Sequence, residues 1–197
     1  YAPLAEVLIA DEDEPATPEL TEILNYVRAA SHGFEWVSEG RPISVALLTE
    51  LQGLLMRGTP LDQESGRIRT TQVVIGRRAG APPSAFPVHQ ARFVPPPPGS
   101  DLQAGLQQLV DWMRIDHRKE IDPVVAAAMS HYGFETLHPF RDGNGRIGRL
   151  LIVLFLQAIG VLSEPTLTVS PWFESRRGEY YDSLLGVSAQ NRWDDYI

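Results

Sequence analysis

Apolar residues recur at helical spacing along most of this chain, and this periodicity limits the fold more than any other feature. Leu20, Ile23, Leu24 and Val27 stand at positions i, i+3, i+4 and i+7, the pattern of a helix with one buried face. Thr17-Pro18 just before them is typical of a helix start. Such patterns predict helices at about residues 4–8, 17–27, 44–56, 101–113, 123–132, 145–159 and 172–187.

One region, residues 58–100, lacks this helical spacing. Within it, residues 70–75 are rich in β-branched side chains, and residues 91–94 are the candidate partner strand. The four prolines at 95–98 favour an extended chain that leads back to the helices. Residues 123–132 are apolar on nearly every side, which predicts a central, buried helix. We therefore predict an all-α fold with one small β-hairpin.

The composition fits a folded protein and excludes several classes. With 43% hydrophobic residues among 197, the chain can bury a core. The absence of Cys excludes disulfides, thiol nucleophiles and Cys-bound zinc, and it fits a reducing compartment, so we expect a cytoplasmic protein. The net charge of −8 argues against a nucleic-acid partner. The longest apolar stretch, residues 150–159, contains a Gln and is about half a bilayer span, so no membrane segment is expected.

The two ends of the sequence suggest a fragment of a longer chain, because it begins at Tyr1 without an initiator Met and finishes abruptly at Ile197. We expect residues 1–40 to form an N-terminal helical arm, truncated at its start. This arm is expected to pack on a core domain formed by residues 41–197.

Residues 138–149 read His-Pro-Phe-Arg-Asp-Gly-Asn-Gly-Arg-Ile-Gly-Arg and collect groups suited to phosphate. His138 ends the preceding helix because Pro139 follows it, and its imidazole titrates near neutral pH. Backbone N–H groups at the start of the next helix form an anion site. Arg146 and Arg149 are three residues apart and project from one face of that helix. Two guanidinium groups beside such a site suit a polyphosphate.

Asp142 adds a carboxylate of the kind that holds Mg²⁺ together with substrate phosphates. The spacing is not a P-loop, because no Lys follows the glycines. A metal-hydrolase site built from His131, Glu135, His138 and Asp142 is disfavoured, because the His-Glu-x-x-His pattern is absent and Pro139 breaks the helix before Asp142. From the residues alone we favour an anion or nucleotide site with His138 as candidate base.

The same segment resembles the motif of the Fic family, His-x-Phe-x-(Asp/Glu)-Gly-Asn-Gly-Arg-x-x-Arg, at every defined position. The matching residues are His138, Phe140, Asp142, Gly143, Asn144, Gly145, Arg146 and Arg149. Residues 44–51, 92–98 and 179–181 are also similar to an early helix, to the stretch after a flap and to a late helix beside the nucleotide base. The resemblance implies a Fic-type helical core with a β-hairpin flap, at about residues 68–94, over a motif loop at residues 138–149.

The resemblance further implies transfer of AMP from ATP to a Tyr, Thr or Ser hydroxyl of a target protein. His138 would act as general base, and Asp142 would hold Mg²⁺ at the α- and β-phosphates. Phe140 would pack inward and fix the loop, and Arg149 would pair with the γ-phosphate. The full set expected to bind ATP is Gly143, Asn144, Gly145, Arg146, Ile147, Gly148 and Arg149.

The flap implies a second contact, with the target protein. A target segment would add as a strand to the residues Thr71, Gln72, Val73, Val74, Ile75 and Gly76. Tyr181 is the candidate wall for the adenine, although core packing explains it equally well. ATP and a target protein are the expected partners, while self-modification and a homo-oligomer stay open.

Many Fic proteins are restrained by a helix with (Ser/Thr)-x-x-x-Glu-(Gly/Asn). Neither Glu39 nor Glu179 lies in this pattern, and residues 1–10 resemble the stretch that follows it, so we expect the inhibitory helix to be missing here. Other functions stay open: the same fold with AMP removal, another nucleotide or phosphate transfer, or a nucleotide-sensing module. Gly145 argues against phosphate transfer, which relatives with Lys at that position perform.

Overall fold

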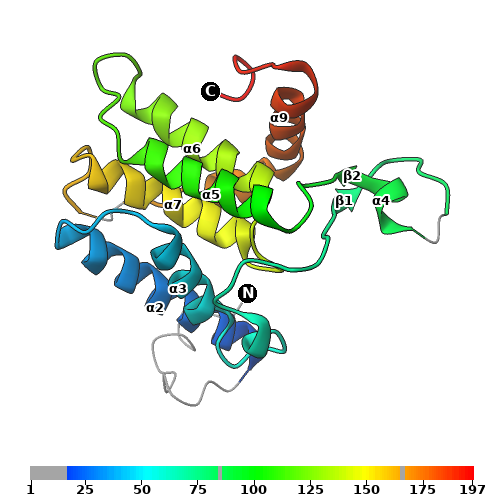
Figure 1. Ribbon diagram of the computed structural model, residues 1–197, viewed down its shortest axis with the longest axis horizontal. Helices are drawn as coiled ribbons and strands as arrows, with labels where there is room; N and C mark the ends of the chain where they lie inside the picture. The colour runs from blue at the N-terminus through cyan, green and yellow to red at the C-terminus, as the bar shows by residue number, and fades with distance from the viewer. Residues whose placement is uncertain (1–16, 84–85, 165–166) are drawn as a thin grey trace.

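The computed structural model describes residues 17–83, 86–164 and 167–197, so the helix expected near residues 4–8 lies outside it. The described part is mostly helical and carries one two-stranded sheet (Figure 1), which confirms the predicted all-α fold with a small hairpin. The elements are α2 (Pro18–Ser38), α3 (Val45–Met56), the 3-10 turn η1 (Asp62–Glu64), β1 (Ile75–Arg77), α4 (Pro87–Gln90), β2 (Ala91–Phe93), α5 (Ser100–Met113), α6 (Pro123–Leu137), α7 (Asn144–Ala158), α8 (Ser170–Ser175) and α9 (Arg177–Gln190). None of these helices is both long and apolar enough to cross a membrane.

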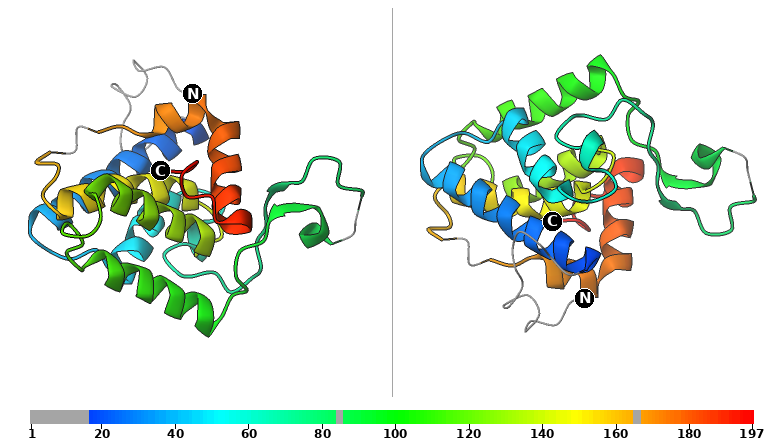
Figure 2. Two further views of the ribbon diagram at one scale, coloured as in Figure 1. Left: turned by 90° about the horizontal axis from the view of Figure 1, so that it is seen from above. Right: turned by 90° about the horizontal axis from the view of Figure 1, so that it is seen from below.

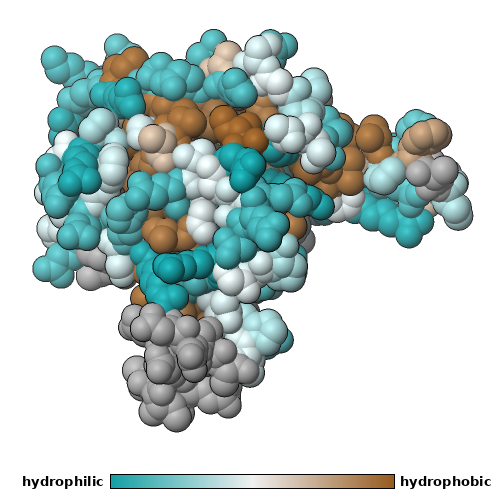
Figure 3. Space-filling model, turned by 60° about the horizontal axis from the view of Figure 1, so that its bottom comes forward, coloured by the Kyte–Doolittle hydropathy of each residue, from teal (hydrophilic) through white to brown (hydrophobic). Residues whose placement is uncertain are grey.

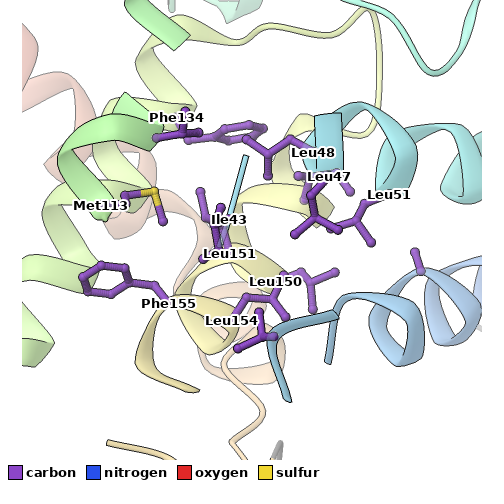
Figure 4. Close-up of a cluster of buried hydrophobic side chains, with 14 of the residues drawn as sticks. Ile43, Leu47, Leu48, Leu51, Met113, Phe134, Leu150, Leu151, Leu154 and Phe155 are labelled. Carbon is purple, nitrogen blue, oxygen red and sulfur yellow. The ribbon is translucent and has the colours of Figure 1, made fainter. Parts of the chain in front are cut away.

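The core forms around α7. This helix packs against α2, α3 and α6, and Figure 4 shows Leu150, Leu151, Leu154 and Phe155 of α7 facing side chains from α3, α5 and α6. The sequence predicted that α6 would be the buried central helix. That prediction holds only in part, because Val124 in the first turn of α6 is 64% exposed.

The N-terminal helix α2 shares this core. Ala29 and Val37 of α2 are buried in the same cluster as the α7 side chains, and α2 contacts both α3 and α7. The division of the chain into an arm and a core near residue 40 stays a prediction.

Polar side chains fix the helix ends as the sequence indicated. The hydroxyl of Thr17 accepts a hydrogen bond from the Leu20 N–H at 3.2 Å, and Ser44 caps α3 in the same way. At the other end of α3, the buried amide of Asn25 donates to the carbonyls of Leu55 at 3.2 Å and Arg57 at 2.6 Å. These bonds join α2 to the last turn of α3.

The hairpin projects from one side of the helical body (Figure 2). Its strands are antiparallel, with Ile75 opposite Phe93 and Arg77 opposite Ala91. The first strand was predicted at residues 70–75, which is wrong by about five residues at its start. Continued along the chain, the register would place residues 71–73 opposite the prolines at 95–97, and proline has no N–H to donate to a ladder.

The helix predicted at residues 172–187 is divided into α8 and α9. Arg176, between them, has φ −120° and ψ 31°, which is not helical. The change of direction lets rings from both helices pack on one buried histidine: Phe173 of α8 lies 5.6 Å and Tyr180 of α9 lies 5.9 Å from the ring of His131.

Replacing Asn25 by Ala tests the link between α2 and α3. The substitution leaves the carbonyls of Leu55 and Arg57 without their donor, so we expect the free energy of unfolding to fall by about 1–3 kcal/mol. Urea unfolding followed by circular dichroism measures this loss. The exposed Gln103→Ala on α5 is the control and should change it by less than about 0.5 kcal/mol; equal losses would contradict a structural role for the Asn25 amide.

Candidate functional site

His138 stands where α6 ends, in a backbone conformation that is rare for a residue with a side chain. Its φ is 47° and its ψ is 60°, and its N–H donates to the Phe134 carbonyl at 2.9 Å. Pro139 follows and prevents the helix from continuing. The left-handed turn separates α6 from the motif loop, and 19% of the His138 side chain stays exposed.

Arg69 holds this turn in place. Its side chain is 4% exposed, and it hydrogen bonds to backbone carbonyls from three parts of the chain. The acceptors are His138 at 2.8 Å and Leu137 at 3.4 Å, Thr71 at 3.2 Å and Pro96 at 2.6 Å. The carboxyl end of α6 attracts the positive charge because the helix dipole is negative there. Arg69 therefore ties the end of α6 to both legs of the hairpin.

The motif loop closes through Asn144. Its buried amide donates to the Phe140 carbonyl at 2.8 Å and accepts from the Phe140 N–H at 2.9 Å. Phe140 is fully buried against Phe134. Gly143 has φ 83°, and a Cβ there would lie 2.9 Å from the side chains of Leu55 and Met56, so the turn requires glycine.

The loop ends at the N-terminus of α7, where the first N–H groups have no partner within the helix. Gly145 lies in this first turn, and Arg146 and Arg149 extend from it. Arg146 forms an ion pair with Glu22 of α2 at 3.0 Å, and the Nε of Arg149 donates to the Ser170 hydroxyl at 3.2 Å. Backbone donors, a dipole and two guanidinium groups together favour a phosphate at this helix end.

Asp142 is exposed beside the helix start, and one of its carboxylate oxygens accepts the Gly143 N–H at 2.6 Å. Among the described residues, no three His, Cys, Asp or Glu side chains form a metal-binding group. A single carboxylate fits Mg²⁺ that takes most of its ligands from phosphate and water. It does not fit an ion held by the protein alone.

Ile147 and Gly148, also expected to bind ATP, face the interior of the protein. Ile147 is 1% exposed, and the Gly148 carbonyl accepts a hydrogen bond from the Nδ1 of His131 at 2.9 Å. The Nε2 of His131 then accepts from the Tyr180 hydroxyl at 2.8 Å. This buried chain of bonds joins α6, α7 and α9, and the expected contact of Ile147 and Gly148 with ATP stays a prediction.

Burial shifts the pKa values of three groups on α6 and at its end, two downward and one upward. It lowers the pKa of His131 and that of His138 to about 4, and the charge of Arg69 lowers the pKa of His138 further. Burial raises the pKa of the Glu135 carboxyl to about 7, against the opposing influence of Arg149. At neutral pH the His138 imidazole is therefore uncharged and able to accept a proton.

A cavity of about 270 Å³ lies between the hairpin, the end of α6 and α9. Tyr181 lines it together with Ile75 and Gly76 of the hairpin and Glu135 of α6. Figure 3 shows apolar surface where the hairpin joins the helical body. Of the six residues expected to contact a target, Ile75 and Gly76 thus line this cavity, whereas residues 71–74 precede the strand.

Sequence reasoning missed residues that shape the site from a distance. Arg69 appears in the sequence as one basic residue in a β-prone stretch. The amide of Gln52 accepts the Gly66 N–H at 2.6 Å and donates to the Asp142 carbonyl at 3.2 Å, which links α3 to the motif loop. A polar residue within an apolar helical pattern was the available signal for both Gln52 and Glu135.

The three shifted groups predict how stability depends on pH. Between pH 6.5 and 4 the unfolded chain protonates His131 and His138 before the folded protein does, so the free energy of unfolding falls as the pH is lowered. Glu135 acts in the opposite sense, because the folded protein binds its proton first, from about pH 7 downward. Urea unfolding from pH 7 to 4 should show a net fall.

The variant Glu135→Gln should show a steeper fall over the same interval, because the opposing contribution of the carboxyl is removed. Glu120→Gln, which changes a surface carboxylate, should follow the unmodified protein. Equal slopes for Glu135→Gln and the unmodified protein would contradict a raised pKa for Glu135.

Known proteins are similar to this chain in sequence and in structure. Residues 42–156 match the family model for the Fic/DOC family. The protein adenylyltransferase fic-1 of Caenorhabditis elegans is 37% identical over 121 residues, which are 61% of this chain and 20% of that protein. A probable protein adenylyltransferase of Aquifex aeolicus is 29% identical over 157 residues, 77% of this chain and 43% of that protein. The chain thus spans less than half the length of these curated relatives.

The solved structures agree in fold. A Fic family protein from Desulfovibrio desulfuricans is similar with a TM-score of 0.73 and 28% identity, over 99% of this chain and 55% of that one. The family match covers more than half of the 197 residues and includes the whole loop from His138 to Arg149. By its sequence, its helical core and its hairpin, this chain belongs to the Fic/DOC family.

Proposed function

We propose that this protein transfers AMP from ATP to a Tyr, Thr or Ser hydroxyl of a target protein. One observation carries the proposal: an uncharged, partly exposed His138 stands one short loop away from a helix N-terminus that bears Arg146 and Arg149. A proton acceptor next to a phosphate site is what transfer to a hydroxyl requires. The name protein adenylyltransferase, carried by both curated relatives, supports AMP as the transferred group.

In the proposed reaction, His138 takes the proton of the target hydroxyl as its oxygen attacks the α-phosphorus of ATP. The bond from that phosphorus to the β-phosphate oxygen breaks, and pyrophosphate leaves. The N–H groups at the start of α7 stabilise the charge on the α-phosphate in the transition state. Burial lowers the pKa of His138, and the Arg69 charge acts in the same direction, so the imidazole is unprotonated at neutral pH and ready to act as a base.

The β- and γ-phosphates of ATP, its Mg²⁺ and its adenine have candidate partners on either side of the proposed α-phosphate site. Arg149 is placed for the γ-phosphate, and Arg146 for its neighbours. The ion pair between Arg146 and Glu22 is partly exposed, and such pairs are weak enough for a phosphate to replace the carboxylate. Asp142 would hold Mg²⁺, which supplies charge to neutralise phosphate oxygens. The cavity beside Tyr181 has the size to take the adenine.

The hairpin is the proposed docking site for the target. β1 pairs with β2 along one edge of a two-stranded sheet, and an extended segment can add to the other edge through main-chain hydrogen bonds. Residues 71–76 include this strand and the extended leg before it. The lack of Cys supports a reducing, cytoplasmic setting for the reaction.

Labelled ATP tests the proposed transfer. With cell extract and Mg²⁺, we expect label from the α-phosphate on protein, including any self-modification, and none from the γ-phosphate. His138→Ala should reduce labelling by at least about 100-fold, the usual contribution of a general base. His117→Ala, at a histidine that bonds to Trp112 far from the loop, is the matched control. Label from the γ-phosphate would instead indicate phosphate transfer, and ATP binding without labelling would indicate a sensor.

A proline in the hairpin leg tests strand addition. The Arg78 N–H donates to Gln90 of the other hairpin leg, so the N–H groups of alternate residues, among them Val73, are directed to the free edge. Val73→Pro removes one such N–H, so we expect the KM for a labelled target to rise about three- to tenfold, the equivalent of about 1 kcal/mol for one hydrogen bond. The affinity for ATP, measured by calorimetry, should not change. Val73→Ala keeps the N–H and is the control. If the two variants raise KM equally, the target does not bind through this part of the backbone.

A further inference from the structure

Glu135 is a buried carboxyl that the proposed reaction does not yet use. It lies in the last turn of α6, three residues before His138, and its side chain is 11% exposed. Its Oε2 is 3.9 Å from the Nδ1 of His138. Among the described residues, neither the buried Oε1 of Glu135 nor the buried Nδ1 of His138 has a hydrogen-bond partner. The Glu135 carboxyl thus presents its Oε2 to the unsatisfied Nδ1 of His138, while its Oε1 lies beside Gly148.

The space for this carboxyl is provided by α7. A Cβ at Gly148 would lie 2.4 Å from the Oε1 of Glu135, so a larger residue at that position would displace the carboxyl. On α7, Arg149 is the charged group that faces Glu135. The neutral His131 lies against the same glycine. On the C-terminal side, burial raises the pKa of the Tyr180 and Tyr196 phenols, and the negative charge of Glu135 acts in the same direction on both.

Of these neighbours, His138 is the group that Glu135 can satisfy. Among the described residues Glu135 takes part in one ion pair, the contact with His138 Nδ1, whereas Arg149 donates to Ser170. A hydrogen bond between these two atoms requires the 3.9 Å distance to shorten to about 2.8 Å, a movement of about 1 Å. Because an unmet buried donor or acceptor is costly, each of the two groups gains from this bond.

The direction of that bond depends on where the proton is. An ionised carboxylate accepts a hydrogen bond from Nδ1–H, which leaves Nε2 without a proton. A protonated carboxyl donates to Nδ1, which places the imidazole proton on Nε2. Since Nδ1 is buried, a hydroxyl from outside can reach only Nε2, and only the first arrangement can take its proton.

We propose that Glu135 is a positioning residue for His138: its carboxylate fixes the tautomer with Nδ1–H and so makes Nε2 the proton acceptor for the target hydroxyl. The inference rests on the proposed function of His138 as base. When the hydroxyl proton arrives at Nε2, the Glu135 carboxylate also stabilises the imidazolium that forms. The raised pKa of Glu135, about 7, places the change between the two arrangements near neutral pH.

Imidazole nitrogen spectra test the tautomer without any substrate. Long-range proton–nitrogen NMR of the ¹⁵N-labelled protein should show His138 with Nδ1–H at pH 8 and a change towards Nε2–H as the pH falls through about 7. In Glu135→Gln the spectrum of His138 should not change over this interval, because the amide does not titrate. Glu120→Gln should behave as the unmodified protein. A His138 tautomer that ignores both pH and the Glu135→Gln substitution would overturn the proposal.

The pH dependence of transfer gives a second readout. The kcat for AMP transfer should rise with pH through about 7 in the unmodified protein and in Glu120→Gln. In Glu135→Gln the kcat should no longer depend on pH in this range, and at pH 8 it should be at least about tenfold lower than in the unmodified protein. This loss is smaller than the roughly 10⁴-fold fall in kcat that the equivalent change causes in a serine protease triad. The KM for ATP should stay unchanged.

Two further outcomes distinguish a failure of the proposal for Glu135 from a failure of the proposed AMP transfer. A raised KM for ATP with the His138 spectrum and kcat unchanged would mean that Glu135 acts through Arg149, which overturns the proposal. If the unmodified protein transfers no label from ATP, the proposed function fails, yet the nitrogen spectra still decide whether Glu135 sets the tautomer. Circular dichroism of Glu135→Gln confirms that the variant is folded in each case.

Discussion

A single buried guanidinium connects the parts of this structure that would carry out its reaction. Within the described part of the chain, Arg69 has no carboxylate partner, and its hydrogen bonds go to backbone carbonyls at the end of α6 and in both legs of the hairpin. The arrangement is stable because several aligned carbonyls carry enough negative potential to replace a counter-charge. The position of His138 and the path of the hairpin depend on this side chain, and its charge adds to the effect of burial in lowering the pKa of the imidazole.

A second buried network fixes the opposite wall of the site. The bonds from Tyr180 through His131 to the Gly148 carbonyl dock α9 against α7, and they require His131 to carry its proton on Nδ1. Tyr181, the next residue of α9, is thereby set in the cavity wall opposite Ile75 and Gly76 of the hairpin. The net charge of −8 gives no indication of this local arrangement. Arg146 and Arg149 lie near one helix N-terminus, where Glu22 is the ion-pair partner of Arg146.

The sequence predicted what depends on neighbours in the chain. Local rules for Thr, Ser and Pro explain the start of α2 at Pro18, the cap at Ser44 and the end of α6 at Leu137. The motif loop could be recognised because its residues are consecutive in the sequence. The start of β1 and the break at Arg176 were missed because they depend on distant partners: the prolines opposite one leg of the hairpin and the ring of His131. Arg69 was missed for the same reason, since most of the carbonyls around it are distant in sequence. Glu135 is only three residues from His138, and the sequence indicated it only as a candidate metal ligand, because its burial depends on the packing of α7.

The two groups at the end of α6 show how burial can serve stability and chemistry in different ways. Burial of His138 keeps a base uncharged at neutral pH, at a cost that appears only when the pH falls. Burial of Glu135 has the opposite linkage, because its ionised form is the unfavourable one in the folded protein. A chain selected for stability alone would place an apolar residue at this position, where Gly148 leaves room for a side chain. A carboxyl at this position, beside the Nδ1 of the His138 imidazole, is therefore better explained by its proposed effect on the imidazole proton than by a contribution to the stability of the fold.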